Sequence, residues 1–399
     1  MMNYENPDKY FIRVKLVLIS LLYAICSFAG QTFAQDFKTV HDGVEYAQVE
    51  HKIGSDPVKV NLLRLDLKKV RLDVHHALDK AIGLETTSSI ATRKGAVAAI
   101  NSGFFRLDQS EFAGETVGNL LIDRRLFSES FGDRISLGIL NAKDSTRVSV
   151  GRIFYDVWLR IGKFSYPVSG LNREAKPRET ILFFPEFGNV TPKSPSANEI
   201  TVKANRILNV PTTGGGNEIP RDGFVISSTG PLPNEILINS SVGTHVFVRQ
   251  NILTESIDTG HGGQRRRFLD SPEDVVSGVP QLVELGEIRI TWEKEKSSRS
   301  FVETRHPRTA VAKLKDGKFL MMTVDGRQPG VSVGMSLQEL AEYLLSLGAV
   351  DAMNLDGGGS TTMFLDGKVV NTPSDKKGER KVGDAILVTL RKKPAARKK

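Results

Sequence analysis

Hydrophobic and polar side chains alternate along much of the chain, and this two-residue period predicts β-strands. In residues 36–80 apolar side chains recur at alternate positions, which is typical of half-buried strands joined in hairpins. Further strand-like runs follow within 117–170 and 200–255. The intervening segment 185–199 is rich in Pro, Ser and Asn, so we expect a loop or a domain edge there.

The C-terminal third predicts a strand, a helix and a second strand. The apolar run 319–324 is the first strand, and 350–355 is the second. Between them Ser336 and Glu339 form a capping box ahead of an apolar helical stripe. Such a crossover usually joins parallel strands of one sheet. The predicted fold class is α/β (α+β): a mixed β-sheet core with flanking helices, including this C-terminal strand–helix–strand crossover, plus N-terminal strands.

Composition and charge exclude several classes of protein. The 399 residues are 40% hydrophobic and 25% charged, so neither wholesale disorder nor a collagen-like fibre fits. The single cysteine excludes a disulfide framework and a Cys-rich zinc site. Of the net charge of +8, six positive charges lie in residues 391–399. The rest of the chain is close to neutral, so a nucleic-acid partner is not predicted.

The first 34 residues predict export. Arg13 and Lys15 precede the short apolar run 16–30, and Ala34 offers a cleavage site. The alternative, an uncleaved membrane anchor, is disfavoured because the run is shorter than the roughly 20 residues of a spanning helix. We expect a periplasmic or secreted protein with no stable membrane span after cleavage. The predicted organisation is a signal peptide (1–34), an N-terminal β-rich segment (35–94), a main domain (95–390) and a basic tail (391–399).

The ends of the two C-terminal strands carry candidate catalytic groups. Asp325 and Asp356 each follow an apolar run directly. Parallel strands bring their carboxyl ends to one edge of a sheet, where ligands of open α/β sheets bind. Two carboxylates on one rim suit acid and base roles. The alternative is that each is an ordinary turn residue, because Asp-Gly is common in turns.

A run of three glycines follows Asp356, at Gly357, Gly358 and Gly359. Consecutive glycines cost chain entropy, and they make sense where backbone approaches a ligand and its N–H groups hold an anion. No lysine follows them, so this is not a Walker loop. Ser360 lacks the G-x-S-x-G context, which leaves a serine nucleophile as a minor alternative.

Arg308 is a candidate anion-binding residue. It follows Pro307 and enters the apolar run 310–314. A guanidinium buried there needs an anionic partner, and its two-pronged geometry suits phosphate or carboxylate. The alternative is a solvated surface arginine.

Five motifs stand in this order along the chain: Ile100–Phe105, Arg305–Val311, Val324–Arg327, Ser332–Ser336 with Glu339–Ala341, and Asn354–Thr362. Together they resemble the phosphodiester glycosidase family. The chain departs from the family pattern at Ser102, where a second glycine is common, and in 277–283, which keeps only part of a Gly-rich segment. The resemblance covers about residues 95–390.

The resemblance implies hydrolysis at a sugar anomeric carbon whose leaving group is a phosphodiester. It implies three catalytic residues, Asp325, Asp356 and Arg308, with Arg308 holding the phosphate. Which aspartate is acid, base or nucleophile stays open. The implied substrate-binding residues are Asn101, Thr309, Arg327, Gly357, Gly358, Gly359, Ser360 and Thr361.

The predicted partner is a phosphorylated glycan or sugar-1-phosphodiester, in an envelope glycan or exopolysaccharide. No cofactor or metal ligand is predicted, and a divalent cation is an alternative to that prediction. The competing function is a non-catalytic glycan-binding module of an exopolysaccharide or envelope system. Such a module would not need both carboxylates, so their presence together favours the enzyme.

Overall fold

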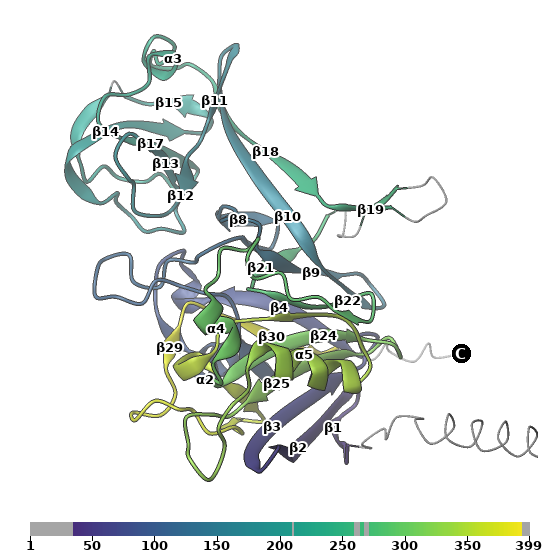
Figure 1. The fold of residues 1–399 in the computed structure, drawn as a ribbon. Helices are drawn as coiled ribbons and strands as arrows, with labels where there is room; N and C mark the ends of the chain where they lie inside the picture. The colour runs from purple at the N-terminus through teal and green to yellow at the C-terminus, as the bar shows by residue number, and fades with distance from the viewer. Residues whose placement is uncertain (1–34, 210, 259–263, 267–270, 393–399) are drawn as a thin grey trace, which may run out of the picture. The chain divides into compact units, whose positions relative to one another are not determined.

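The computed structural model describes residues 35–209, 211–258, 264–266 and 271–392 (Figure 1). The described residues from Phe37 onward form one compact unit. The predicted signal peptide and positions 393–399 of the predicted tail lie outside the described residues. Within the described ranges, no helix has the length and hydropathy needed to cross a membrane.

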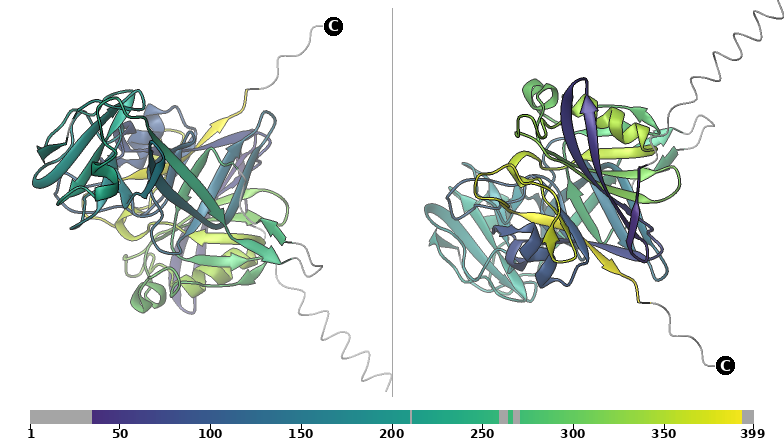
Figure 2. Two further views of the ribbon diagram at one scale, coloured as in Figure 1. Left: turned by 90° about the horizontal axis from the view of Figure 1, so that it is seen from above. Right: turned by 90° about the horizontal axis from the view of Figure 1, so that it is seen from below.

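An eight-stranded antiparallel sheet carries the C-terminal motifs. Its pairings join strands far apart in the sequence, so the hairpin of β2 and β3 lies beside β25 (Figures 1 and 2). The strand order is β1 (Lys38–His41), β2 (Val44–Ile53), β3 (Asp56–Leu65), β25 (Phe319–Val324), β24 (Arg308–Leu314), β26 (Ala349–Asn354), β22 (Gln281–Glu284) and β23 (Glu287–Ile288).

A five-stranded antiparallel sheet shares a core with the first. Alternate side chains of β25 face two different cores: Met321 packs toward Ile100 and Ile386 of the second sheet, and Met322 toward the opposite face. Helix α5 (Leu337–Ser346) covers that opposite face. The order of the second sheet is β28 (Lys368–Val369), β27 (Met363–Leu365), β6 (Ala98–Asn101), β30 (Asp384–Leu390) and β4 (Val70–His76).

The middle of the chain forms further sheets. A seven-stranded sheet contains β11 (Phe164–Pro167), β10 (Thr146–Ile161), β9 (Ile135–Asn141), β21 (Asp274–Ser277), β7 (Leu120–Ile122), β8 (Arg125–Ser128) and β18 (Val246–Thr254). A six-stranded sheet contains β12 (Gly170–Leu171), β13 (Thr180–Phe183), β17 (Gly223–Thr229), β14 (Lys193–Lys203), β15 (Arg206–Ile207) and β16 (Thr212–Gly215).

Short elements complete the described chain. The two-stranded pairs are β19 (Ser256–Asp258) with β20 (Gln264–Arg266), and β5 (Glu85–Thr86) with β29 (Lys381–Val382). The remaining helices are α2 (Thr87–Arg93), α3 (Asn234–Leu237), α4 (Arg299–Glu303), and the 3-10 turns η1 (Ala77–Asp79) and η2 (Gly358–Ser360).

The predicted α/β (α+β) fold class is wrong. Among the residues that the structure describes, strands take up 47% and helices 9%, and the pairings of the two site-bearing sheets are antiparallel. Helix α5 and its capping box form as predicted, and α5 does connect β25 to β26. These two strands are not neighbours, however, because β24 lies between them and pairs antiparallel with both. The crossover therefore steps over one strand of an antiparallel sheet.

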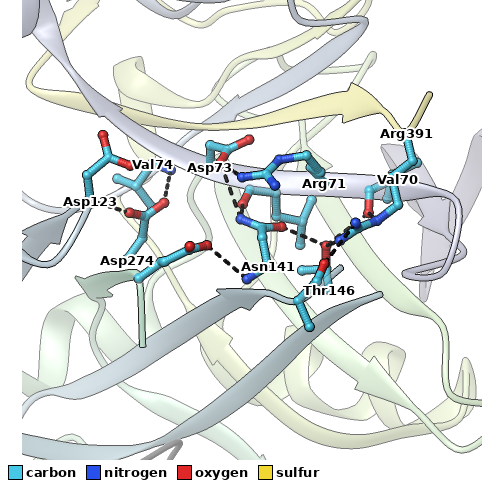
Figure 3. Close-up of polar contacts among 12 residues, drawn as sticks. Val70, Arg71, Asp73, Val74, Asp123, Asn141, Thr146, Asp274 and Arg391 are labelled. Carbon is cyan, nitrogen blue, oxygen red and sulfur yellow. Dashed lines mark hydrogen bonds and ion pairs between the residues drawn. The ribbon is translucent and has the colours of Figure 1, made fainter. Parts of the chain in front are cut away.

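A buried polar network ties the seven-stranded sheet to β4 (Figure 3). The carboxylate of Asp274 accepts hydrogen bonds from the backbone N–H groups of Val74 at 2.8 Å and Asp123 at 2.9 Å. Burial raises the pKa of Asp274 to about 7. Arg391, which begins the predicted basic tail, donates to Val70 O and to the Thr146 hydroxyl, so this residue is anchored to the sheets.

Candidate active site

The three predicted catalytic residues lie along one edge of the eight-stranded sheet. Arg308 is the first residue of β24, Asp325 follows the last residue of β25, and Asp356 comes two residues after the end of β26. Because β25 and β26 both run antiparallel to β24, their carboxyl ends meet the start of β24. The shared edge expected for the two aspartates is thus present, although the strands are not a parallel pair.

The carboxylate of Asp325 is held by the segment that follows β28. Asn371 Nδ2 donates to its Oδ1 at 3.1 Å, and the backbone N–H of Thr372 donates at 3.0–3.1 Å to both oxygens. The residue is 1% exposed. Burial raises the pKa of Asp325, and the bonds from Asn371 and Thr372 oppose that rise. Both carboxylate oxygens of Asp325 thus accept hydrogen bonds from groups of the protein itself.

Asp356 has a different environment. It is partly exposed, and its Oδ1 accepts a hydrogen bond from the N–H of Gly357 at 2.9 Å. Burial in the site raises the pKa of Asp356 to about 6, while the nearby guanidinium groups of Arg380 and Arg134 oppose the rise. A carboxyl group that ionises close to neutral pH and reaches solvent suits acid–base or nucleophilic chemistry.

Asn101 and Thr309 hold the Asp356 loop in place. Asn101 Nδ2 donates to the carbonyl of Asp356 at 2.7 Å, and its Oδ1 accepts from Thr309 Oγ1 at 2.8 Å and from Thr362 N at 3.0 Å. Both residues are buried. Their polar atoms therefore bond within the protein, although the resemblance implied that they contact the substrate.

The glycine loop packs closely against its neighbours. Gly357 N donates to Asp356, and Gly358 N donates to Pro307 O at 2.9 Å, so these two amides are already engaged. A Cβ on Gly359 would lie 2.1 Å from the guanidinium of Arg380, which pairs with Asp375. The glycine thus leaves room for an arginine beside Asp356.

Arg308 is a buried cation. It is 1% exposed, and its guanidinium donates to the backbone carbonyls of Met335, Phe301 and Thr304, each at 2.8 Å. Within the described ranges, no carboxylate lies at ion-pair distance from it. Burial, followed by the charge of Arg327, lowers the pKa of Arg308 to about 9. An anionic ligand would relieve this uncompensated positive charge.

Arg327 and His306 extend the positive region. Arg327 is exposed, and its guanidinium lies against Gly358, where an added Cβ would be 3.0 Å from Nη2. The described residues provide it with no ion pair. His306 has a buried Nδ1 without a hydrogen-bond partner. Burial lowers the pKa of His306, with help from Arg308 and Arg327. Two arginines and an unsatisfied imidazole thus line one side of the glycine loop.

Three unpartnered hydroxyl groups follow the glycines in the chain. The side-chain oxygens of Ser360, Thr361 and Thr362 are buried and have no hydrogen-bond partner. The Ser360 hydroxyl lies close enough to lower the pKa of Asp356. Buried orphaned hydroxyls are rare in folded proteins, and water or a ligand usually completes them. A polar ligand at this place would satisfy them.

Sequence reasoning missed an aromatic and arginine cluster beside Asp356. The guanidinium of Arg134 lies over the rings of Phe104, at 5.3 Å, and Phe131, at 5.1 Å. Phe104 meets Phe301 edge to face, and Phe301 lies under Arg308. Phe104 lies within the motif Ile100–Phe105, and that position was the only signal for the cluster in these sequence motifs. Arg134, Phe131 and Phe301 lie in segments whose local pattern carries none.

Asn371, Thr372 and Asp384 were also missed. Asn371 Nδ2 bonds both to Asp325 and to the carbonyl of Thr361, at 3.0 Å, so it links Asp325 to the loop of Asp356. Asp384 begins β30 and is fully buried. No group of three or more His, Cys, Asp or Glu side chains within the described ranges is arranged to hold a metal ion.

Sequence comparison identifies relatives for part of the chain. The phosphodiester glycosidase family model matches residues 196–389. The N-acetylglucosamine-1-phosphodiester alpha-N-acetylglucosaminidase of Mus musculus is 34% identical over 166 residues, 39% of this chain and 29% of the mouse protein. The Bos taurus enzyme of that name is 36% identical over 110 residues, 25% of this chain and 20% of the bovine protein. The matches thus span less than a third of these mammalian relatives.

Two solved structures share the fold. A hypothetical protein from Synechocystis superposes with a TM-score of 0.73 at 23% identity, covering 90% of this chain and 64% of that one. A Burkholderia pseudomallei protein, whose name describes it as exported, gives a TM-score of 0.71 at 24% identity and covers 84% and 74%. The family resemblance predicted from the sequence motifs is confirmed by the family match.

Proposed function

We propose that the protein is an exported hydrolase that cleaves the glycosidic bond of a sugar-1-phosphodiester, because residues 196–389 match the model of the phosphodiester glycosidase family. Its substrate would be a phosphorylated envelope glycan or exopolysaccharide. One observation carries the proposal: a partly exposed carboxyl, Asp356, shares a sheet edge with Arg308, a buried cation for which the described residues provide no carboxylate partner.

Asp356 is the proposed reacting carboxylate. With a pKa of about 6 it is mostly ionised at neutral pH, and it acts as base toward water or as nucleophile toward C1 of the sugar. The bond between C1 and the phosphate oxygen breaks, its electron pair leaves with the phosphate, and the oxygen of water ends on C1. The products are a free sugar and a phosphomonoester. Such a leaving group needs little protonation, so a strong general acid is dispensable.

The arginines are the proposed phosphate site. Arg327 is exposed beside the glycine loop and would contact the phosphate directly. Arg308, whose guanidinium already binds carbonyl groups, would stabilise the negative charge from behind. Asp325, Asn101 and Thr309 hold the loop and position Asp356. The hydroxyls of Ser360 and Thr361 would bond to substrate oxygens.

The test is incubation of the protein with a set of sugar-1-phosphodiesters and, for comparison, the alkyl glycosides of the same sugars. We expect free sugar and phosphomonoester only from the phosphodiesters. NMR of the first sugar anomer released distinguishes a base from a nucleophile. Tight binding of glycan without release of any sugar would overturn the enzyme proposal in favour of a binding module. N-terminal sequencing of the protein from an envelope fraction tests export: a chain that still begins at Met1 or Met2 contradicts it.

A further inference from the structure

Asp384 is a fully buried carboxyl group next to the proposed site. Its Oδ1 accepts a hydrogen bond from the backbone N–H of Gly103 at 2.5 Å. Its Oδ2 is buried and has no hydrogen-bond partner, and the same is true of the hydroxyls of Ser102 and Thr116. These hydroxyls lie beside the carboxyl and lower its pKa. None of the described residues forms an ion pair with Asp384.

The dipeptide Ser102–Gly103 separates Asp384 from Asp356. Ser102 N donates to the carbonyl of Asp384 at 3.2 Å, and Ser102 O accepts from the N–H of Asp356 at 2.9 Å. An added Cβ on Gly103 would lie 3.1 Å from Asp384 Oδ2, so only glycine lets the backbone pass this close to the carboxyl without displacing it. Two carboxyl-bearing residues therefore flank one short, tightly packed segment.

We infer that Asp384 is a third carboxyl group of the site, which keeps its proton while Asp356 is ionised and thereby controls the charge beside the reacting carboxylate. Its role in the reaction rests on the function proposed above. Asp384 touches no reacting atom in this scheme; it is a positioning residue that acts through Asp356.

The surroundings explain why the proton stays on Asp384. Burial, with a smaller contribution from the charge of Asp356, raises the pKa of Asp384 to about 7. Opposite Asp384 in β4 stands His76, whose pKa burial lowers to about 4, so it is neutral and offers no compensating charge. The guanidiniums of Arg134 and Arg380 act on Asp356. Two neighbouring carboxyl groups titrate as a pair. Once Asp356 is ionised, its negative charge opposes the ionisation of Asp384, which therefore loses its proton only at a higher pH.

The consequence is a loss of activity on the alkaline side. As the pH rises through about 7, Asp384 ionises and adds a second negative charge beside Asp356. That charge repels an anionic substrate and changes the ionisation of Asp356. We therefore expect kcat/KM to fall above this pH, mainly through a rise in KM.

Asp274 is a matched control for Asp384. It too is buried and has its pKa raised to about 7. In contrast to Asp384, each of its carboxylate oxygens accepts a backbone N–H, from Val74 and from Asp123 (Figure 3). It ties strands together outside the site. Asp274→Asn replaces one accepting oxygen with an NH2 group and should lower stability without altering the pH profile of activity.

The experiment compares the wild-type chain with Asp384→Asn, Asp274→Asn, Asp356→Asn and the double variant Asp356→Asn/Asp384→Asn. In activity assays we expect Asp384→Asn to lose the alkaline decline and to keep the decline on the acid side. Asp274→Asn should keep both. If Asp384→Asn retains the alkaline decline of the wild type, the inference is wrong. Asp384→Ser, which also removes the carboxyl, replaces Asp384→Asn in every arm if that variant does not fold.

Thermal unfolding tests the same ionisation without any substrate. A buried carboxyl with a raised pKa costs no stability below the unfolded pKa of about 4, and the cost grows until the pH passes the folded pKa. The Tm of Asp384→Asn should therefore rise relative to wild type between about pH 4 and pH 7. In an Asp356→Asn background this rise should end at a lower pH, because the neighbouring charge is gone.

The two readouts separate the possible failures. If no phosphodiester is hydrolysed but the Tm difference follows this pattern, the proposed function fails while the coupling of the two carboxyls stands. A Tm difference that does not change with pH overturns the protonation of Asp384. If the Tm difference caused by Asp384→Asn extends over the same pH range in the Asp356→Asn background, Asp384 is not coupled to Asp356.

Discussion

Asn371 is the residue whose removal should most directly expose how the site is built. Its Nδ2 donates to Asp325 Oδ1 at 3.1 Å and to Thr361 O at 3.0 Å, and its Oδ1 accepts from Met363 N at 2.7 Å. One buried side chain thus connects the end of β25 with the loop after β26. Asn371→Ala removes all three bonds.

The loss of stability follows from the polar groups that Asn371→Ala leaves without a hydrogen-bond partner. Met363 N and Thr361 O are buried, and each unsatisfied buried polar group costs about 1–3 kcal/mol. Water that enters the vacated volume will satisfy part of them. We expect a loss of roughly 2–5 kcal/mol in the free energy of unfolding. The pKa of Asp325 should rise further, because a hydrogen bond that lowers it is gone.

Urea denaturation followed by circular dichroism measures this loss, with activity on a sugar-1-phosphodiester at a permissive temperature as the second readout. The control is Asn239→Ala. Asn239 makes one exposed bond, to Glu235 O at 2.7 Å, and its loss should change stability by less than about 0.5 kcal/mol. If Asn371→Ala unfolds at the same urea concentration as wild type and remains fully active, Asn371 does not hold the two aspartate-bearing segments together.

Three further outcomes are expected. Arg327→Ala should raise KM about ten- to a hundredfold with an unchanged Tm, because it removes one exposed charge-assisted contact of about 1.5–3 kcal/mol. An unaltered KM in steady-state kinetics would argue against a contact between Arg327 and the phosphate. Gly359→Ala should reduce kcat, since its Cβ displaces Arg380 from beside Asp356, and a wild-type kcat would refute that reason. The acid side of the wild-type pH profile should follow ionisation of Asp356, so kcat/KM should increase as the pH rises through about 6; a flat profile between pH 5 and 7 would contradict it.

Local patterns predicted the elements better than their arrangement. The two-residue period gave strands, and the capping box at Ser336 marked the start of α5 correctly. Nothing in the strand–helix–strand pattern reveals that β24, which precedes it in the sequence, inserts between β25 and β26. The edge that carries Asp325 and Asp356 was predictable because the two strands still run in the same direction, whether or not they touch.

The roles of polar side chains depend on partners that the local sequence does not show. Asn101 ends an apolar run, as a ligand-binding residue would, but its bonds go to Thr309 and the Asp356 loop more than 200 positions away. Asp384 begins an apolar strand and so looks like an ordinary strand boundary. Only the pairing of β30 with β6 places it beside Ser102 and Asp356, the proposed reacting carboxylate.

The release of free sugar from a sugar-1-phosphodiester by wild type and by Asp356→Asn tests the central claim most directly. The control is Asp366→Asn, the same substitution at an exposed turn between β27 and β28. We predict that wild type and Asp366→Asn release sugar at the same rate, and that Asp356→Asn is about 10²–10³-fold slower while its Tm does not fall. If Asp356→Asn hydrolyses the phosphodiester as fast as wild type, Asp356 is not the reacting carboxylate and the site lies elsewhere.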